Sequence, residues 1–313
     1  MRRVTDPPRR GGAPAPSAVR RGRERVRRRA VCALLGAVLL GTLSVWIWRG
    51  NSVISVSAYT VCSDRLPPAL SGLRIAQVSD LHGAVFGARN EALLRALREA
   101  RPDLIAVTGD LIDSYRTGRD PDLWQDTAET VLRMTEIAPV YYVTGNHESR
   151  LRAVYPALEE TLRGGGVTVL RNQAAVFSIR GESIRLWGAD DPAFAAAADE
   201  AATMDRALQT LEEADSDGTA FTLLLSHRPE LLEVYAAHGV DLVLSGHAHG
   251  GQFRLPGLGG LIAPGQGLLP AYTSGLYRSG GTVMAVSRGL GNSLFPFRVN
   301  NPPELVLVTL ETV

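Results

Sequence analysis

The sequence has only two cysteines and no lysine at all, so all 33 of its basic residues are arginines. Cys32 lies inside an apolar run and Cys62 follows it, which makes an intrachain disulfide geometrically implausible. The folded part must therefore be stabilised by an apolar core, and 313 residues of which 45% are apolar suffice for one large domain. We interpret the missing lysine as compositional bias, since arginine and lysine differ physically but total absence is rarely selected.

The charge is unevenly distributed along the chain. Residues 1–49 hold 12 arginines against two acids, a net charge of +10, whereas the remainder holds 21 arginines against 30 acids, a net charge of −9. Residues 1–29 are rich in proline, glycine and arginine and are predicted to be disordered, because they lack the apolar content to pack. The tail is short, adjoins an apolar run and precedes an acidic part, so we predict no nucleic-acid partner.

Residues 30–48 form a run of 19 residues without a charged side chain. As a helix this run would be ~28 Å long, close to the thickness of the bilayer core. Arginines precede it, and Trp46 and Trp48 close it, as expected for a positive-inside flank and an aromatic belt. We therefore predict an uncleaved transmembrane signal anchor in the cell membrane. The tail would be cytoplasmic, and a catalytic domain over residues 52–313 would lie outside the cytoplasm.

The alternatives to a membrane anchor are a buried core helix and a cleaved signal peptide. A buried core helix is disfavoured, because nothing before residue 30 could pack around it. A cleaved signal peptide stays open, since Val56-Ser57-Ala58 fits a small-residue cleavage site. That site lies ten residues beyond the apolar run, and cleavage there would cut through residues 52–61, which are predicted to form a strand.

From residue 52 onward, strand-like segments alternate with helix-like segments. Strands are predicted at residues 73–79, 104–108, 140–144, 167–170, 175–179, 184–187, 221–226, 240–245 and 305–310, and helices at 90–100, 123–137, 148–163 and 193–213. Strands separated by helices imply βαβ units, and the clustered short strands suggest a second sheet.

Five of the six histidines lie in or beside short polar motifs that follow these apolar runs. The motif residues are Asp80, His82, Asp110, Asn146, His147, His227, His247 and His249. Because ligands bind at the carboxyl ends of strands in open α/β sheets, these residues can converge. Asp80/His82 and His247/His249 are i, i+2 pairs. Such residues point the same way in extended backbone, so each pair can give two ligands to one centre.

Carboxylate, amide and imidazole ligands gathered at strand ends predict a metal site, here with enough ligands for two divalent ions. Asp80 and Asp110 only partly neutralise the two ions, so the centre stays positive and attracts a phosphate ester. Two ions ~3.5–4 Å apart lower the pKa of a shared water and clamp an in-line phosphoryl displacement. Asp110 can bridge them, and His147, left over after the ligands are assigned, is free to protonate the leaving oxygen. Such ligands accept Mn, Fe, Zn or Co alike.

In type and order, these motifs over about residues 73–252 resemble the calcineurin-like metallophosphoesterase superfamily. The resemblance implies a two-sheet β-sandwich flanked by helices, a four-layer α/β/β/α fold that is here preceded by one transmembrane helix. It also implies a ligand set and a catalytic residue. One ion would bind Asp80, His82, Asp110 and His249, the other Asp110, Asn146, His227 and His247, and His147 would act as acid or transition-state stabiliser.

A narrower resemblance follows from residues 250–252, 275–277, 287–291 and Arg298. They are similar to a bacterial subgroup, often membrane-anchored, that includes UDP-2,3-diacylglucosamine hydrolases. With the anchor and the Gly/Pro/Leu-rich loop 255–270, this favours a phosphodiesterase or pyrophosphatase for lipid or envelope phosphoesters. A loop that only packs over the sheet would look the same. The alternative is a non-catalytic scaffold that uses the fold to bind a membrane or envelope partner, but such proteins typically lose ligands.

Overall fold

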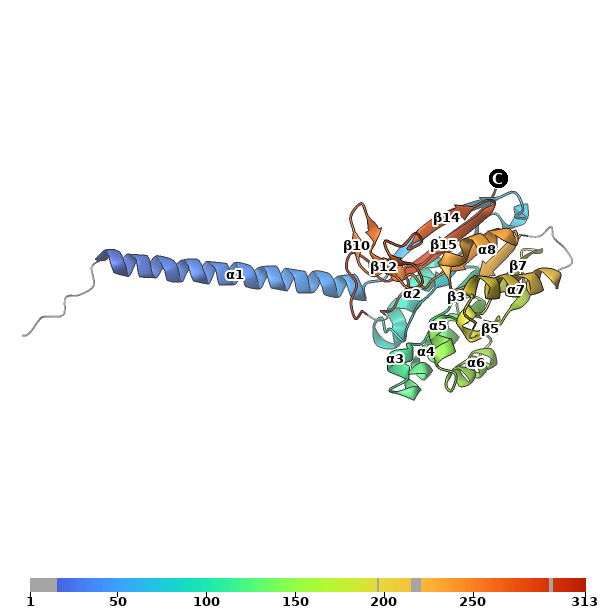
Figure 1. Ribbon diagram of the computed structural model, residues 1–313, viewed down its shortest axis with the longest axis horizontal. Helices are drawn as coiled ribbons and strands as arrows, with labels where there is room; N and C mark the ends of the chain where they lie inside the picture. Colours follow the sequence, from blue (N-terminus) through green and yellow to red (C-terminus); the bar gives the residue numbers. More distant parts are fainter. Residues whose placement is uncertain (1–15, 196, 215–220, 293–294) are drawn as a thin grey trace, which may run out of the picture. The chain divides into compact units, whose positions relative to one another are not determined.

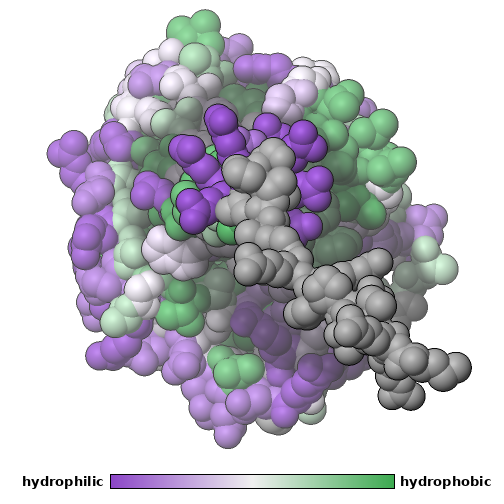
Figure 2. All heavy atoms as spheres, turned by 90° about the vertical axis from the view of Figure 1, so that its left-hand side faces the viewer, coloured by the Kyte–Doolittle hydropathy of each residue, from purple (hydrophilic) through white to green (hydrophobic). Residues whose placement is uncertain are grey.

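The computed structural model describes residues 16–195, 197–214, 221–292 and 295–313. It divides into two units, Met1–Trp48 and Arg49–Val313. Helix α1 (Pro16–Ser52) runs through the first unit, and its segment Arg20–Ser52 is long and apolar enough to cross a membrane. Hydrophilic side chains gather around the beginning of this helix (Figure 2).

The beginning of α1 differs from the sequence-based expectation. Residues 16–29 are helical, although we predicted disorder for residues 1–29. Arginine is a good helix former, and a helix nucleated in the apolar run extends at little cost through the arginines before it. Residues 1–15 lie outside the described residues, so the prediction for them stays a prediction.

The second unit is built on two six-stranded sheets (Figure 1). The first sheet has the order β1 (Ser55–Ser63), β16 (Glu304–Thr312), β2 (Leu73–Val78), β3 (Leu104–Thr108), β4 (Val140–Val143) and β5 (Thr168–Val169). Strand β1 runs parallel to β16, β16 runs antiparallel to β2, and β2 to β5 are parallel. The parallel part of this sheet brings the ends of β2, β3 and β4 to one edge.

The second sheet has the order β14 (Gly275–Ser279), β15 (Thr282–Val286), β9 (Leu242–Ser245), β8 (Thr222–Leu225), β7 (Glu182–Gly188) and β6 (Gln173–Ile179). Its four central strands are parallel, and both edge strands are antiparallel to their neighbours. Two small hairpins follow β9, formed by β10 (Arg254–Leu255) with β11 (Gly259–Gly260) and by β12 (Ile262–Ala263) with β13 (Gly267–Leu268).

Three apolar clusters hold the layers of this unit together. Strand β2 shows why: Leu73 and Ile75 pack between the sheets, while Ala76 and Val78 face the helices, because successive side chains of a strand point to opposite faces. The outer face of the first sheet carries α2 (Glu91–Ala100), α4 (Trp124–Met134) and α6 (Tyr155–Gly164), and that of the second carries α7 (Glu200–Glu213) and α8 (Leu232–Ala237). This confirms the four-layer α/β/β/α fold.

The short helices complete the described part of the chain. They are α3 (Ser114–Thr117), α5 (Asn146–Arg150), η1 (Pro68–Leu70), η2 (Ala88–Asn90), η3 (Pro121–Leu123), η4 (Pro192–Ala195), η5 (Pro229–Leu231) and η6 (His249–Gly251). Every segment of the three core clusters lies within residues 49–313, and the most apolar window of α1 is 0% buried. The described core of the second unit is therefore built from residues 49–313 alone.

Two predicted helices differ in the structure. The helix expected over 148–163 is two helices, α5 and α6, because α6 restarts with Pro156 in its first turn, a position that proline favours. The helix expected over 193–213 is η4 followed by α7, which begins only after Asp199. The Asp199 carboxylate accepts a hydrogen bond from the backbone N–H of Ala202 at 2.9 Å and caps the helix.

Candidate metal centre

The predicted ligands come together at the ends of five strands. Asp80 follows β2, Asp110 follows β3, Asn146 follows β4, His227 follows β8 and His247 follows β9. All five side chains are at most 5% exposed. The amide of Gln77, near the end of β2, donates to Thr108 Oγ1 at 3.0 Å and to the Ser245 carbonyl at 2.9 Å, which ties the ends of the two sheets together.

The ligand atoms form two groups, in each of which all atoms lie within 4.8 Å of one another. The first group is Asp80, His82, Asp110 and His249, and the second is Asp110, His227 and His247. Asp110 belongs to both: its Oδ2 lies 3.7 Å from His82 Nε2 and 3.1 Å from His227 Nε2. One carboxylate oxygen thus stands between the two groups, as a bridging ligand requires.

The backbone that carries these ligands is not extended. The φ angles of Asp80, His82, His247 and His249 are 50°, 47°, 65° and 46°, in the left-handed region that non-glycine residues rarely adopt. Asp80 and His82 join one ligand group, whereas His247 and His249 join different groups of the centre, so the i, i+2 spacing alone does not fix which ion a residue serves. Left-handed backbone of this kind costs about 1–3 kcal/mol per residue and concentrates at functional sites.

Glycines let the motifs approach one another. A Cβ atom on Gly145 would overlap the Asp110 carboxylate, and one on Gly246 would overlap Ser79 Oγ and Asp80 Oδ2. These two glycines precede Asn146 and His247, so the motifs need glycine for close approach and not only for a turn.

A buried carboxylate organises the loop that carries Asp110. The oxygens of Glu148 accept hydrogen bonds from the backbone N–H groups of Asp110, Leu111, Ile112 and Gly145, at 3.0, 2.8, 3.3 and 2.8 Å. Burial, and then the charge of Asp110, raise the pKa of Glu148 to about 7. Glu148 directly follows His147 in the sequence, but no role was predicted for it, so this positioning role was missed.

Burial keeps most of the site histidines neutral. Burial lowers the pKa of His82 and His247 well below the usual value and that of His249 to about 3. Burial acts the same way on His227, but the Asp110 carboxylate outweighs it and raises the pKa of His227 to about 10. Neutral imidazole is the form that binds metals.

The donor set fits two divalent cations. His82 Nε2 and His249 Nε2 face each other at 3.2 Å, and His227 Nε2 faces His247 Nδ1 at 3.2 Å. Asn146 Oδ1 is buried and has no hydrogen-bond partner among the described residues. His227 Nδ1 lies 2.7 Å from the Thr108 carbonyl, to which it donates, so Nε2 is the nitrogen that would give up its proton to bind a metal. An unpartnered buried acceptor and opposed ring nitrogens suit cations bound between them.

His147 is placed differently from the other site histidines. It belongs to neither ligand group, and its Nδ1 accepts a hydrogen bond from the backbone N–H of Ser114 at 2.9 Å. In a neutral imidazole that acceptor role puts the proton on Nε2. Burial lowers the pKa of His147. The ring lines the cavity in front of the ligands.

This cavity has a volume of about 310 Å³, and some of the residues that line it were not predicted as site residues from the sequence. Besides the motif residues Asp110, Asn146, His147, His247 and His249, it is lined by Tyr115, Arg150, Glu200, Arg228, Pro264 and Gly265. Arg228 is held by Asp191, whose oxygens accept from its Nε at 2.6 Å and from its Nη2 at 3.0 Å. In the sequence, the position of Arg228 directly after His227 could have pointed to a role in the site, whereas nothing in the sequence pointed to Arg150.

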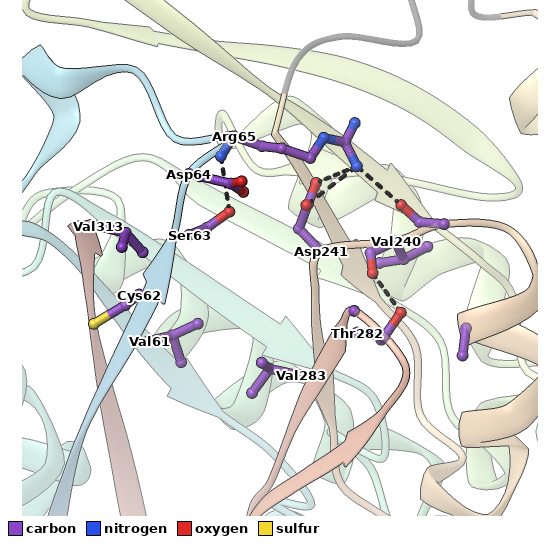
Figure 3. A pocket seen from close by; sticks show the side chains of 13 residues that line it. Val61, Cys62, Ser63, Asp64, Arg65, Val240, Asp241, Thr282, Val283 and Val313 are labelled. Atoms are coloured by element: carbon purple, nitrogen blue, oxygen red, sulfur yellow. Dashed lines mark hydrogen bonds and ion pairs between the residues drawn. The ribbon is translucent and has the colours of Figure 1, made fainter.

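A larger cavity of about 390 Å³ lies at the opposite end of β9 and is not the metal site (Figure 3). Its walls come from the end of β1, the starts of β9 and β15, and the last residue, Val313. Arg65 reaches across it to Asp241 at 3.1 Å. No histidine lines it, so cavity size alone does not locate the site.

Comparisons with known proteins agree with this geometry. A family model described as calcineurin-like phosphoesterase matches residues 73–251. "Uncharacterized metallophosphoesterase YkuE" of Bacillus subtilis is 30% identical over 91% of this chain and 98% of its own length. "Phosphodiesterase YaeI" of Escherichia coli is 31% identical over 68% of this chain and 72% of its own. "Transmembrane protein with metallophosphoesterase domain" of Danio rerio is 30% identical over 79% of this chain and 55% of its own.

Fold and site together define a dinuclear metallophosphoesterase. Because the family model matches residues 73–251, the chain belongs to the calcineurin-like phosphoesterase family. The two ligand groups agree with this assignment. It is a metal-dependent phosphoester hydrolase that uses two divalent ions. The scaffold alternative is not supported, since every predicted ligand is present and buried.

Proposed function

We propose that this protein is a membrane-anchored phosphodiesterase or pyrophosphatase that hydrolyses lipid or envelope phosphoesters. An apolar cavity that adjoins the metal cavity carries the proposal. It has a volume of about 290 Å³ and is lined by His249, Gln252, Ile262, Ala263, Pro264, Gly265, Gly267 and Phe295. His249, Pro264 and Gly265 line both cavities. A phosphate at the ligand groups would thus have an apolar space beside it, which suits a substrate with a hydrocarbon portion.

Within the family, we place the chain in the subgroup resembling UDP-2,3-diacylglucosamine hydrolases. The residues of that resemblance pack behind the ligands. A Cβ on Gly289 would overlap Asp80, and one on Gly291 would overlap the Leu81 carbonyl. The buried guanidinium of Arg298 donates to the carbonyls of Arg288, at 2.7 Å, and of Gly291. These contacts support a role of the subgroup residues in holding the metal ligands.

The proposed roles follow the two ligand groups. One ion would be held by Asp80, His82, Asp110 and His249, and the other by Asp110, Asn146, His227 and His247. When bound, the ions supply an activated water and charge stabilisation for an in-line displacement at phosphorus.

The remaining cavity residues would bind and protonate the substrate. Arg150 and Arg228 are the cations in the cavity lining, and both would attract and orient the phosphate. His147 would donate its Nε2 proton to the leaving oxygen, while the Ser114 N–H holds the ring in the required tautomer.

We also propose a topology: residues 1–29 in the cytoplasm, residues 30–48 as a single membrane span, and residues 52–313 as the catalytic domain outside the cytoplasm. Helix α1, the net charge of +10 over residues 1–49 and the transmembrane relatives support it. An external domain favours an envelope lipid over a cytoplasmic nucleotide-linked lipid, although the subgroup resemblance alone would suggest the latter.

A substrate panel tests the proposal. The full chain, reconstituted with Mn²⁺, Zn²⁺ or Fe²⁺, is offered soluble phosphomonoesters, soluble diesters and lipid-linked pyrophosphates, with Asp110→Ala as the control. We expect the lipid-linked substrates to have the highest kcat/KM. Higher kcat/KM for soluble monoesters under every metal would contradict the lipid assignment.

A further inference from the structure

Besides Ile262, which lines the apolar cavity beside the metal site, six large apolar side chains are exposed on the segments that flank this cavity. Leu255, Leu258, Leu268, Leu269, Phe295 and Phe297 have 43, 66, 76, 58, 42 and 41% of their surface exposed. We call them the hairpin surface, since four lie on or beside the hairpins β10–β11 and β12–β13. Exposed apolar side chains in this number on neighbouring segments mark an interaction site.

The segments of the hairpin surface are joined to one another. The Phe253 ring packs 5.2 Å from that of Phe295 and 5.7 Å from that of Phe297, centroid to centroid. The Leu261 N–H donates to the Phe253 carbonyl at 2.9 Å, and the Leu269 N–H donates to the Leu261 carbonyl at 2.8 Å. The surface therefore belongs to one packed structure. Hydrophobic side chains also gather on the face of the molecule where β10 and β12 lie (Figure 2).

The chain leaves its apolar run beside this surface. Asn51 Oδ1 accepts a hydrogen bond from the Arg298 backbone N–H at 2.7 Å, and Asn51 Nδ2 donates to the Arg298 carbonyl at 3.1 Å. Arg298 directly follows Phe297. Asn51 comes three residues after Trp48, ~4.5 Å along a helix. If residues 30–48 span the bilayer, Asn51 and the neighbouring phenylalanines lie at its surface, whatever direction α1 takes.

The charge of this region also suits a membrane. Residues 242–303 contain four arginines and no acid, although residues 50–313 as a whole carry a net charge of −9. Arg298 is buried and Arg288 pairs with Glu304 at 2.8 Å, so the surface gains little positive charge, but it lacks the acids by which the rest of the unit would repel anionic lipid headgroups. A soluble protein partner would not require this charge separation.

We propose that the hairpin surface docks on the lipid bilayer, so that the metal cavity opens toward the membrane. Phe295 belongs both to the hairpin surface and to the apolar cavity that shares His249 with the metal site. A lipid phosphoester can then pass from the bilayer into the site without crossing water. The docking rests on the exposed side chains, on the charge and, through the proposed membrane span, on Asn51; the identity of the substrate rests on the proposed function.

Vesicle flotation of the fragment 49–313 tests the docking without α1. The vesicles contain three parts phosphatidylcholine to one part phosphatidylglycerol. Leu258→Asn and Leu268→Asn are made singly and together, and Val176→Asn is the matched control, since Val176 is 64% exposed on β6. We expect the unchanged fragment to float with the vesicles and the double variant to partition about tenfold less. Val176→Asn should behave like the unchanged fragment.

Hydrolysis of a water-soluble nitrophenyl phosphodiester is measured in parallel and should be the same in all variants, which shows that they are folded. No flotation of the unchanged fragment, or an equal loss in Val176→Asn, would overturn the docking. A Leu268-dependent dimer in light scattering, without flotation, would instead assign the surface to a second copy of the chain. Flotation without turnover of any lipid substrate would leave the docking intact and contradict the proposed function.

Discussion

The six histidines of this chain differ in what their ring nitrogens face, and this sets His147 apart from the four histidines of the ligand groups. Four site histidines direct nitrogens at Asp80, Asp110 or one another, whereas His147 Nδ1 faces the Ser114 N–H. His238, which lies outside every motif, is placed between Asp205 and Glu212, with 3.0 Å to each.

The first prediction concerns the proton donor. His147→Ala should retain both metal ions and lose kcat by ~10²–10⁴-fold, the usual size of a general-acid contribution. The loss should be small for a nitrophenyl ester, whose leaving group needs no proton, and large for an alkyl ester. Steady-state kinetics on both esters and metal analysis of the variant measure this. Equal losses on both esters would remove the acid role, and loss of metal would make His147 a ligand.

The second prediction concerns the glycine before Asn146. Gly145→Ala should lose metal and activity, because the added methyl group would overlap the Asp110 carboxylate. Overpacking of this kind typically costs about 1–3 kcal/mol and moves the ligand as well. Gly164→Ala is the control: nothing lies within 4 Å of its Cβ position in α6, so the helix should gain about 0.5–1 kcal/mol. Metal content and urea unfolding distinguish the two. A Gly145→Ala protein with full metal content would show that the loop adapts.

At the scale of the elements, strand ends could be predicted and loop paths could not. Asp80, Asp110 and Asn146 were placed correctly because parallel strands of one sheet end together, and apolar runs mark the strands. The backbone at His247 and His249 could not be read from spacing, since left-handed turns leave no periodic signal. Glu148 and Arg298 support the ligands through contacts that are distant in sequence, 38 residues from Glu148 to Asp110 and 49 from Arg298 to His249.

The third prediction concerns the contact between two loops. Asp191, 1% exposed, holds Arg228 in the loop after β8. Asp191→Ala should cost the fragment 49–313 about 3–5 kcal/mol in the free energy of unfolding, because it leaves a buried guanidinium without its main partner. Asp205→Ala, whose carboxylate is 58% exposed beside His238, should cost less than about 1 kcal/mol. Urea titration measures the free energy of unfolding of both variants. If both lose equally little, solvent already screens the charge of Arg228.

At the scale of the whole molecule, the metal ions should be part of the stability. The fourth prediction is that the purified chain binds two ions and that chelation lowers Tm. Ions at a hundred times their Kd would stabilise the fold by about 2.7 kcal/mol each. Asp110→Ala should lose metal, activity and the chelator response together. Elemental analysis that gives one ion or none per chain would contradict the dinuclear centre.

The fifth prediction concerns topology. A reporter that works only outside the cytoplasm should be active when fused after Val313, and one that works only in the cytoplasm should be active when fused before Met1, because the arginines before residue 30 are retained inside. The opposite pattern would reverse the orientation. A mature N-terminus at Tyr59 would replace the anchor with a cleaved signal peptide.

Strand β1 has a consequence for how the protein is made. It is an edge strand whose sheet partner is β16, paired from Ser55 with Glu304 to Ser63 with Thr312. About 240 residues separate the two, so a ribosome adding 5–20 residues per second delivers the partner roughly 12–50 s after β1. Throughout that interval β1 is an unpaired edge. The first sheet can close only after residues 304–312 have been made, and a stop codon before residue 304 would leave a chain that a protease can recognise.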